Sequence, residues 1–114
     1  MCGFSGFLNF NPNWGDPLTL LQQMGDQLTH RGPDDSGVWF DNNCGVGLSH
    51  RRLSIIDLSA QGHQPMFSTS GRFVIAYNGE IYNHQELKKE LLQAGVIFRG
   101  GSDTEVLLAA IESW

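Results

Sequence analysis

The sequence is poor in basic residues and in long apolar runs. Seven Lys and Arg stand against twelve Asp and Glu, a net charge of -5, and the only adjacent basic residues are the pairs at 51–52 and 88–89. A nucleic-acid-binding face needs clustered Lys and Arg, so the composition argues against a nucleic-acid partner. No apolar run approaches the ~20 residues that cross a bilayer, and the first ten residues lack the basic start of a secretory signal. We therefore expect a cytoplasmic protein without a membrane partner.

Cysteine is also scarce, because only Cys2 and Cys44 are present. Both should stay reduced in the cytoplasm, which disfavours a disulfide between them without excluding it. With the four histidines they never fall at the C-x₂-C or H-E-x-x-H spacings of zinc sites, so no metal site is predicted. The sequence also lacks the glycine-rich loops that bind nucleotides, so no cofactor is expected in this segment. The pair His30-Arg31 is only a weak candidate for binding phosphate.

What the chain does contain fits one small domain. It has 114 residues, of which 40% are hydrophobic, and its 14 glycines indicate many turns rather than a helical bundle. Loose alternation and short runs of apolar residues predict strands, and the candidates are 4–10, 38–40, 46–49, 53–56 and 73–77. The Asn78-Gly79 pair that follows the last of these predicts a hairpin turn.

Three helices are predicted from the residues at their ends. They begin at the N-cap and proline pair Asp16-Pro17, at the capping box Asn83/Glu86 and at the capping box Ser102/Glu105. Gly95 should end the second of them, with a further short strand at 96–98. A β-rich first half followed by helices predicts an α+β fold, with helices packed on antiparallel sheets.

Cys2 is the most informative candidate for catalysis. Removal of Met1 would leave a thiol and a free α-amine on one residue. An α-amine has a reference pKa of about 7.7–8.0 and a thiol one of about 8.5, so near neutral pH the amine can take the thiol proton. Nucleophile and base would then belong to the same residue, as in enzymes with an N-terminal threonine. Gly3 and Gly6 would let a substrate approach the backbone, although on position alone a Cys without function remains the alternative.

Four other residues each admit a structural and a functional interpretation. Asn78 and Gly79 either form a hairpin turn or donate hydrogen bonds to a developing oxyanion. Arg52 either makes a surface ion pair or grips a substrate carboxylate with its forked guanidinium. Asp103 either complements a helix dipole or holds a substrate ammonium. The residues alone leave these alternatives open.

Together the pieces stand in a recognisable order. The motifs are MCGFSG at 1–6, HRGPDD at 30–35, RLSIID at 52–57, YNGEIYN at 77–83 and GSDTE at 101–105. They resemble the N-terminal glutaminase domain of glutamine-dependent asparagine synthetases, which are class II glutamine amidotransferases with the N-terminal-nucleophile hydrolase fold. The resemblance runs along nearly the whole chain. It implies an αββα sandwich built from antiparallel sheets with flanking helices.

The resemblance also implies a reaction and a set of site residues. Glutamine would be hydrolysed to glutamate and ammonia through a thioester on Cys2. The catalytic residues that it implies are Cys2, with its own amine as base, and the oxyanion donors Asn78 and Gly79. The glutamine-binding residues that it implies are Arg52 for the α-carboxylate, Asp103 and Glu80 for the α-ammonium, and Leu53, Ser54, Ile55 and Ile56 along the pocket. One positive and one negative group at the two ends would exclude amides that lack an amino-acid head group.

The family's glutaminase domain is longer than this chain, and a synthetase domain follows it. Residues 1–114 are therefore expected to be a single partial type 2 amidotransferase domain, without its C-terminal part and without the synthetase domain. The resemblance implies that ATP and Mg bind in that second domain, where ammonia would amidate aspartate or a related carboxylate. One alternative is a truncated, non-catalytic fragment, whose exposed sheet edges would favour a homo-oligomer. A thiol redox or metal-binding module is a third hypothesis.

Overall fold

The computed structural model describes residues 2–54 and 59–114. Antiparallel pairing begins near the start of the chain, with Gly3 opposite Arg51. The first sheet has the order β1-β3-β2, formed by β1 (Gly3–Phe7), β3 (Val46–Arg52) and β2 (Asp35–Asp41). The second sheet is a pair of two-residue strands, β4 (Met66–Phe67) and β5 (Val74–Ile75). Short 3₁₀ turns stand at η1 (Pro12–Trp14) and η2 (Ala60–Gly62).

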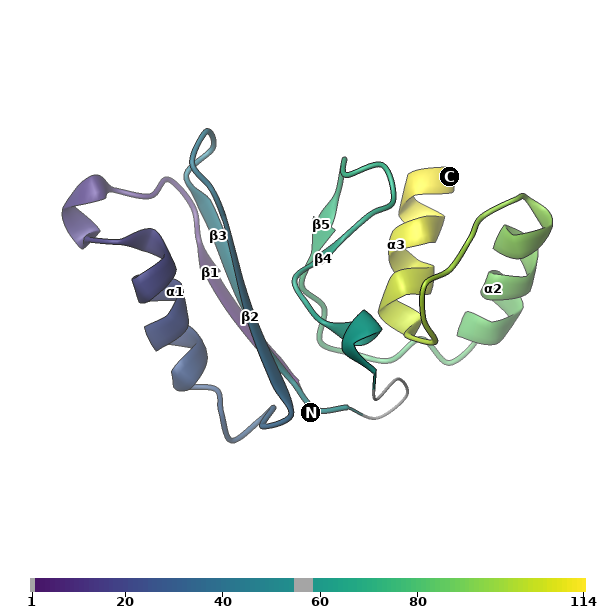
Figure 1. The fold of residues 1–114 in the computed structure, drawn as a ribbon, viewed down its shortest axis with the longest axis horizontal. Helices are drawn as coiled ribbons and strands as arrows, with labels where there is room; N and C mark the ends of the chain where they lie inside the picture. Colours follow the sequence, from purple (N-terminus) through teal and green to yellow (C-terminus); the bar gives the residue numbers. More distant parts are fainter. Residues whose placement is uncertain (1, 55–58) are drawn as a thin grey trace.

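The helices enclose the two sheets from opposite sides. Figure 1 shows α1 (Pro17–Asp26) against the outer face of the first sheet, with α3 (Asp103–Ser113) and then α2 (His84–Gln93) beyond β4 and β5. The layers therefore follow the order helix, sheet, sheet, helix. This confirms the predicted α+β class with antiparallel sheets, and it is consistent with the αββα sandwich of the N-terminal-nucleophile hydrolases.

The period of two along β3 decides which side chains reach the interior between the sheets. Ser49 lies under Gly25 of α1, where a side chain on the glycine would meet the serine hydroxyl. Because alternate residues of a strand point to opposite faces, His50 and Arg52 point the other way, toward the second sheet. Both are buried, with 1% and 8% of their surfaces exposed. Alternation thus delivers a histidine and an arginine to the inner layer.

The predicted helix starts are confirmed, but two of the caps differ in detail. Asp16 caps α1 by accepting from the Thr19 N–H at 2.8 Å. Asn83 stands at the N-cap of α2 without a side-chain capping bond, so the capping box predicted there does not form. Ser102 caps α3 through the Thr104 N–H, whereas the carboxylate of Glu105 turns away to other backbone groups. Only half of that second capping box is therefore present.

Several predicted strands are shorter than expected or absent. The first ends at Phe7, shortly before Asn9, whose φ is 52°. The clearest candidate, 73–77, pairs only at Val74–Ile75, and no strand follows it, so the Asn78-Gly79 hairpin prediction is wrong. In the candidate 53–56, Leu53 lies outside any strand, while residues 55–56 lie outside the described residues. Residues 96–98 also form no strand.

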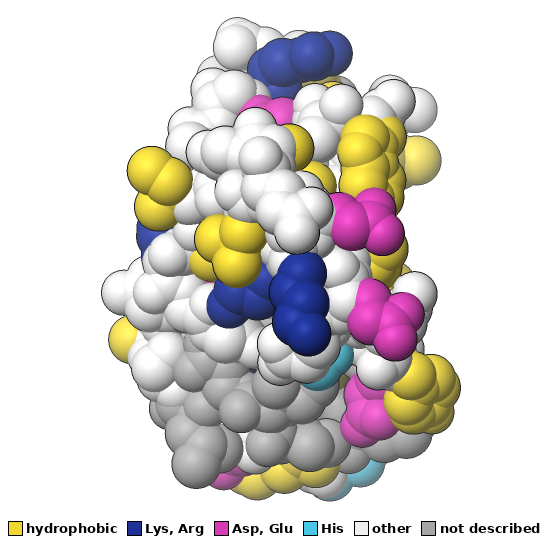
Figure 2. Space-filling model, turned by 90° about the vertical axis from the view of Figure 1, so that its right-hand side faces the viewer, with side chains coloured by type: hydrophobic (Ala, Val, Ile, Leu, Met, Phe, Trp, Pro, Cys, Tyr) yellow, Lys and Arg dark blue, Asp and Glu magenta, His cyan; other side chains and the backbone are white. Residues whose placement is uncertain are grey.

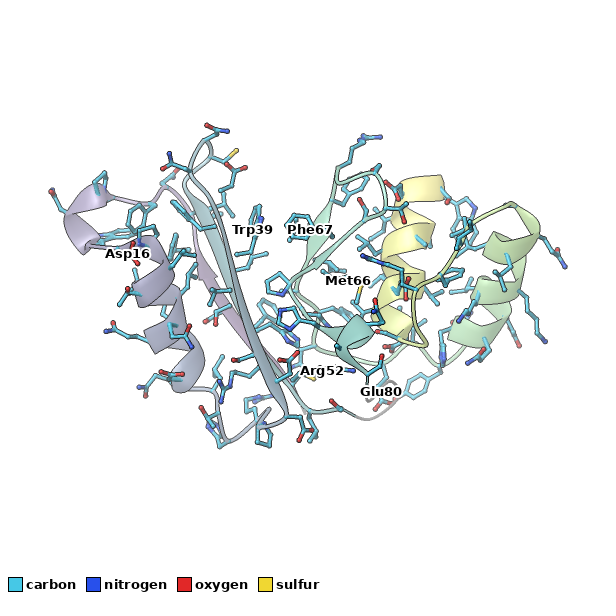
Figure 3. The ribbon with its side chains drawn as sticks, in the orientation of Figure 1. Asp16, Trp39, Arg52, Met66, Phe67 and Glu80 are labelled. Carbon is cyan, nitrogen blue, oxygen red and sulfur yellow. The ribbon has the colours of Figure 1, made fainter. Side chains whose placement is uncertain are left out.

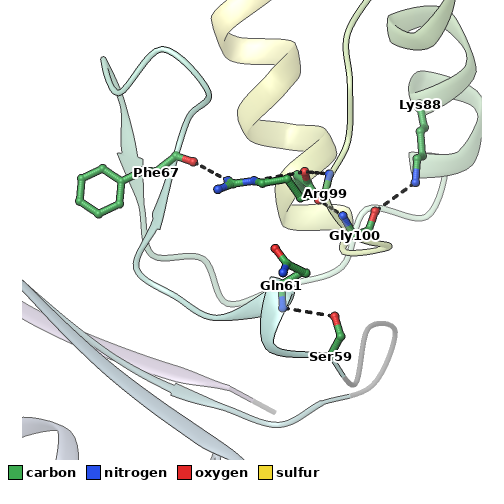
Figure 4. Close-up of polar contacts among 7 residues, drawn as sticks. Ser59, Gln61, Phe67, Lys88, Arg99 and Gly100 are labelled. Atoms are coloured by element: carbon green, nitrogen blue, oxygen red, sulfur yellow. Dashed lines mark hydrogen bonds and ion pairs between the residues drawn. The ribbon is translucent and has the colours of Figure 1, made fainter.

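The segment 96–100 is held by side chains instead of by a sheet. The Glu105 carboxylate accepts from the N–H groups of Arg99 at 2.6 Å and Gly100 at 2.9 Å. Figure 4 shows the Arg99 guanidinium reaching the Phe67 carbonyl and the Lys88 ammonium reaching the Gly100 carbonyl. These bonds tie the segment to β4 and α2, and they fix the start of α3 relative to the second sheet.

The face over α2 carries charges of both signs. Figure 2 shows its Lys and Arg side chains in small groups beside acidic and hydrophobic side chains. Among the described side chains of this face, the basic ones form no continuous patch, as the isolated basic pairs in the sequence indicate. Across residues 2–54 and 59–114, no helix combines the length and apolar character needed to cross a bilayer.

Candidate active site

A cavity of about 320 Å³ lies between the end of β3, the turn η2 and the start of α3. Its lining comes from segments far apart in the sequence, namely Cys2, Arg52, Leu53, Gly62, Gln64, Tyr77, Asn78, Gly79, Glu80, Tyr82, Ser102, Asp103 and Thr104. Figure 3 shows Arg52 and Glu80, two of these lining residues, in the lower part of the view. Trp39 and Phe67 face each other higher up, between the two sheets. The volume is at the lower end of the roughly 300–1,000 Å³ typical of small-molecule sites.

Cys2 enters the cavity because the β1–β3 register ends with Gly3 opposite Arg51. One residue further, Cys2 comes alongside the end of β3, and its Sγ lies 3.2 Å from the N of Leu53, which donates to it. The thiol in turn points to the Leu53 carbonyl at 3.6 Å. The Arg31 Nε donates to the carbonyl of Cys2 at 3.2 Å. The Leu53 backbone therefore holds the thiol, and Arg31 holds the backbone of the same residue, Cys2.

Arg31 belongs to the HRGPDD motif at 30–35, whose residues pack against Cys2 and the end of β3. A side chain on Gly32 would collide with the end of β3, lying 2.5 Å from the N of Arg52. The Asp34 N–H donates to the Arg52 carbonyl at 3.0 Å, and the Asp34 carboxylate accepts from the Ser54 N–H at 2.8 Å. This close packing holds the end of β3 that carries Arg52, and the bond from Arg31 holds the backbone of Cys2.

Arg52 is buried rather than forming the exposed ion pair considered above. Its Nη1 donates to the Ser59 carbonyl at 2.7 Å, and its guanidinium passes directly over Gly62. Among residues 2–54 and 59–114, no carboxylate lies within ion-pair distance of it. A guanidinium in this position presents a fixed positive charge with forked donors to the cavity.

The Asn78-Gly79 pair lies on the cavity wall instead of in a hairpin. Tyr77 folds back over the glycine, so that a Cβ on Gly79 would lie 2.6 Å from the Tyr77 hydroxyl. A side chain on Gly79 would therefore have to displace this ring. The arrangement leaves an amide side chain and a backbone N–H on adjacent residues of the lining, which is the donor chemistry of an oxyanion hole.

Asp103 supplies the negative charge at another part of the wall. It is the first residue of α3 and is 6% exposed, and its Oδ2 accepts from the Ile81 N–H at 2.8 Å. That bond draws the segment containing Glu80 toward the helix start, so both carboxylates line the cavity. The cavity thus combines one guanidinium, two carboxylates, a thiol and an amide.

The structure brings most of the predicted site residues together. Cys2, Arg52, Leu53, Asn78, Gly79, Glu80 and Asp103 all line the one cavity. Ser54 does not, because its N–H is turned toward Asp34. Ile55 and Ile56 lie outside the described residues. Sequence reasoning gave no place in the site to Gly62, Gln64, Tyr77, Tyr82, Ser102 and Thr104, although the last four stand within the quoted motifs.

The two cysteines have different surroundings and no disulfide joins them. Cys44 is exposed in the turn after β2, at the end of the sheet where the Phe10 N–H bonds to Gly45. The length of β1 separates this turn from Cys2, which is far beyond the ~7 Å over which two Cα atoms can be bridged. The neighbouring Asp41 raises the pKa of the Cys44 thiol through a hydrogen bond and its negative charge. Cys44 is thus the natural control residue for any test of Cys2.

Comparison with known proteins agrees with this constellation. The family model described as a glutamine amidotransferase domain matches residues 1–114. The chain belongs to this amidotransferase domain family. The amidotransferase chain is 46% identical to glutamine-hydrolysing asparagine synthetase 1 of Bacillus subtilis over 111 residues, which cover 96% of this chain and 17% of that protein.

Two further relatives show the same pattern of coverage. Glutamine-hydrolysing asparagine synthetase 3 of Bacillus subtilis is 40% identical over 116 residues, which cover 100% of this chain and 18% of that protein. Amidase chry2 of Gibberella zeae is 38% identical over 118 residues, 96% of this chain and 17% of that protein. The amidotransferase chain thus spans less than a fifth of the length of these three relatives.

Proposed function

We propose that this amidotransferase chain binds glutamine in the cavity and hydrolyses it to glutamate and ammonia. The observation that carries the proposal is the meeting of Cys2, Arg52, Asn78 and Asp103 around one cavity of about 320 Å³. The guanidinium of Arg52 is suited to the α-carboxylate and the carboxylate of Asp103 to the α-ammonium. A substrate held by both charges of its head group presents its side-chain amide to the sulfur, which makes the attack effectively intramolecular.

In this proposal Met1 is first removed, because until then the α-nitrogen of Cys2 is a peptide nitrogen. The freed amine takes the thiol proton, and the sulfur attacks the side-chain carbonyl carbon of glutamine. The carbonyl oxygen becomes an alkoxide, to which the Asn78 amide and the Gly79 N–H donate. As the carbon–nitrogen bond breaks, the ammonium of Cys2 returns its proton to the leaving nitrogen, which departs as ammonia. Water then attacks the thioester, one of its protons returns to sulfur through the amine, and glutamate is released.

The fate of the ammonia is the second part of the proposal. The names of the Bacillus subtilis relatives support delivery of the ammonia to an ATP-dependent synthetase that amidates aspartate or a related carboxylate. ATP and Mg would bind outside residues 1–114 and would serve the amidation, not the hydrolysis of glutamine. A protein that carries this chain and the synthetase part should transfer nitrogen-15 from the side-chain amide of glutamine to its acceptor.

Replacing the two cysteines separately tests the hydrolysis. Purified protein whose N-terminal mass shows loss of Met1 is incubated with glutamine, and glutamate and ammonia are measured. Cys2→Ala should lower the rate by roughly 10³-fold or more, because the nucleophile is gone. Cys44→Ala should keep it, since Cys44 is exposed and far from the cavity. Normal turnover by Cys2→Ala would overturn the mechanism, and a folded, processed wild-type chain that releases no ammonia would favour the non-catalytic alternative.

A further inference from the structure

Both hydrogen-bonding atoms of the Tyr77 backbone are held by buried side chains. The Tyr77 N–H donates to Oε1 of Gln64 at 2.7 Å, and the Tyr77 carbonyl lies 3.2 Å from Nε2 of His50. His50 is 1% exposed and Gln64 is 6% exposed. Tyr77 directly precedes Asn78 and Gly79, so the two side chains fix the peptide from which the candidate oxyanion donors extend. No part of the proposed mechanism explains why two buried polar side chains converge here.

The partner atoms dictate the state of His50. A carbonyl oxygen can only accept, so Nε2 must carry the proton that it donates to Tyr77. The other ring nitrogen, Nδ1, has no partner among the described residues. A neutral ring with its proton on Nε2 therefore satisfies the geometry, and burial favours it because desolvation lowers the pKa of His50.

Gln64 also links the Tyr77 peptide to α3, and we call the bonds that His50 and Gln64 make here the clamp. While its Oε1 accepts from Tyr77, its Nε2 donates to the Thr104 hydroxyl at 3.3 Å. Thr104 follows Asp103 at the start of the helix, so one amide joins the Asn78 segment to the element that carries the candidate ammonium ligand. The first sheet leaves room for this approach at Gly37, where an added Cβ would collide with the Gln64 carbonyl.

We propose that His50 and Gln64 are positioning residues that hold the Tyr77 peptide and thereby aim Asn78 and Gly79 into the cavity. The sheet, the loop before β4 and the start of α3 meet at this clamp. The geometric part of the claim stands independently of catalysis, whereas its effect on turnover rests on the proposed glutamine hydrolysis. A displacement of about 1 Å in a catalytic group can cost on the order of 100-fold in rate. Loosening the clamp should therefore lower kcat about 10- to 100-fold while KM stays within about threefold, because the bonds of His50 and Gln64 go to Tyr77 and Thr104 rather than to Arg52 or Asp103.

The test uses three variants of the purified protein. Gln64→Leu removes both bonds of the amide, whereas Gln64→Glu keeps an oxygen that can accept from the Tyr77 N–H. Gln61→Leu is the matched control, because Gln61 is exposed in η2 three residues away. Amide hydrogen exchange at Tyr77 and Gly79 is monitored by NMR and shows whether these backbone amides are protected, with no need for turnover. Glutamine kinetics are measured on the same samples.

The expected exchange at Tyr77 is slow in the wild type, in Gln64→Glu and in Gln61→Leu, and at least tenfold faster in Gln64→Leu. Nitrogen-15 NMR of the imidazole should show the proton of His50 on Nε2. A Tyr77 amide that exchanges in the wild type as fast as an exposed loop, or a His50 ring protonated on Nδ1, would overturn the proposal even if no variant folded. If the wild type hydrolyses no glutamine, the proposed function fails, while the exchange and tautomer data still decide the clamp.

Discussion

Adding one methyl group at Gly62 should weaken glutamine binding without unfolding the protein. Gly62 is buried beneath the Arg52 guanidinium, and a Cβ there would lie 2.6 Å from Cζ and closer still to Nη2. Ordinary carbon contacts lie at about 3.5–4.0 Å, so the guanidinium must move by about 1 Å. The head group is the free end of a flexible side chain and can move at little cost to the fold, but its 2.7 Å bond to Ser59 and its position in the cavity are lost.

The magnitude follows from the interaction that is disturbed. Hydrogen bonds to a charged group contribute about 1.5–3 kcal/mol, so Gly62→Ala should raise KM for glutamine about 10- to 100-fold. We expect kcat to change much less, because Cys2 and Asn78 do not touch residue 62. Steady-state glutamate release gives both constants, and thermal unfolding should show a loss of no more than about 3 kcal/mol, the upper value for the lost bond from Arg52 to Ser59.

Gly101→Ala is the matched control, since a methyl group there meets nothing within 4 Å. It should leave KM unchanged. The reasoning would be refuted if Gly62→Ala moved the guanidinium in a crystal structure and yet bound glutamine as tightly as the wild type. In that case Arg52 would not be the ligand of the α-carboxylate.

Two further predictions concern stability. Burial is the main cause that lowers the pKa of His50, and the Tyr77 carbonyl and Asp35 partly oppose it. At a pH between the folded pKa and the unfolded value near 6.5, the unfolded chain therefore binds more protons than the folded chain. Stability should therefore fall as the pH drops below about 6.5, by at most about 1.4 kcal/mol per pH unit from this group, and urea titrations of His50→Gln should show a flatter dependence. Leu91→Ala should cost about 2–5 kcal/mol in the same assay, because Leu91 is 0% exposed in the core between α2 and α3, whereas Leu92→Ala, at a residue that is 50% exposed, should cost far less. Equal losses for the two leucines, or an unchanged pH slope for His50→Gln, would contradict these assignments.

The helix starts could be predicted because their causes are local. Asp16 stands three residues before the Thr19 N–H that it caps, and Ser102 stands two residues before Thr104. A pattern within a few residues contains both partners of each bond. For the same reason Gly95, with a φ of 93°, marks the end of α2 as predicted.

The shortened strand at Val74–Ile75 could not be read from the sequence, because distant residues determine it. Apolar alternation and Asn78-Gly79 favour a hairpin, but Gln64 and His50 take the backbone groups of Tyr77 that a longer ladder would use. Glu105 similarly takes the N–H groups of Arg99 and Gly100. In both places a buried side chain replaces a strand partner, and only the tertiary structure shows it.

The candidate site shows the same division. The resemblance of the motifs identified Cys2, Arg52 and Asp103, and alternation along β3 explains why Arg52 points inward. The supporting residues Gly62 and Gln64 carry no local signal, because their contribution depends on what packs against them. They become visible only when the end of β3, the turn η2 and the start of α3 are seen together around the cavity.

Trapping the acyl-enzyme tests the central claim most directly. Protein that has lost Met1 is mixed with glutamine, quenched in acid within the first turnover, digested and examined by mass spectrometry. The account predicts one glutamyl group bound through the sulfur of Cys2, none on Cys44, and its disappearance as glutamate is released. Ammonia formed while the Cys2 sulfur stays unmodified, or a glutamyl group found elsewhere, would contradict it.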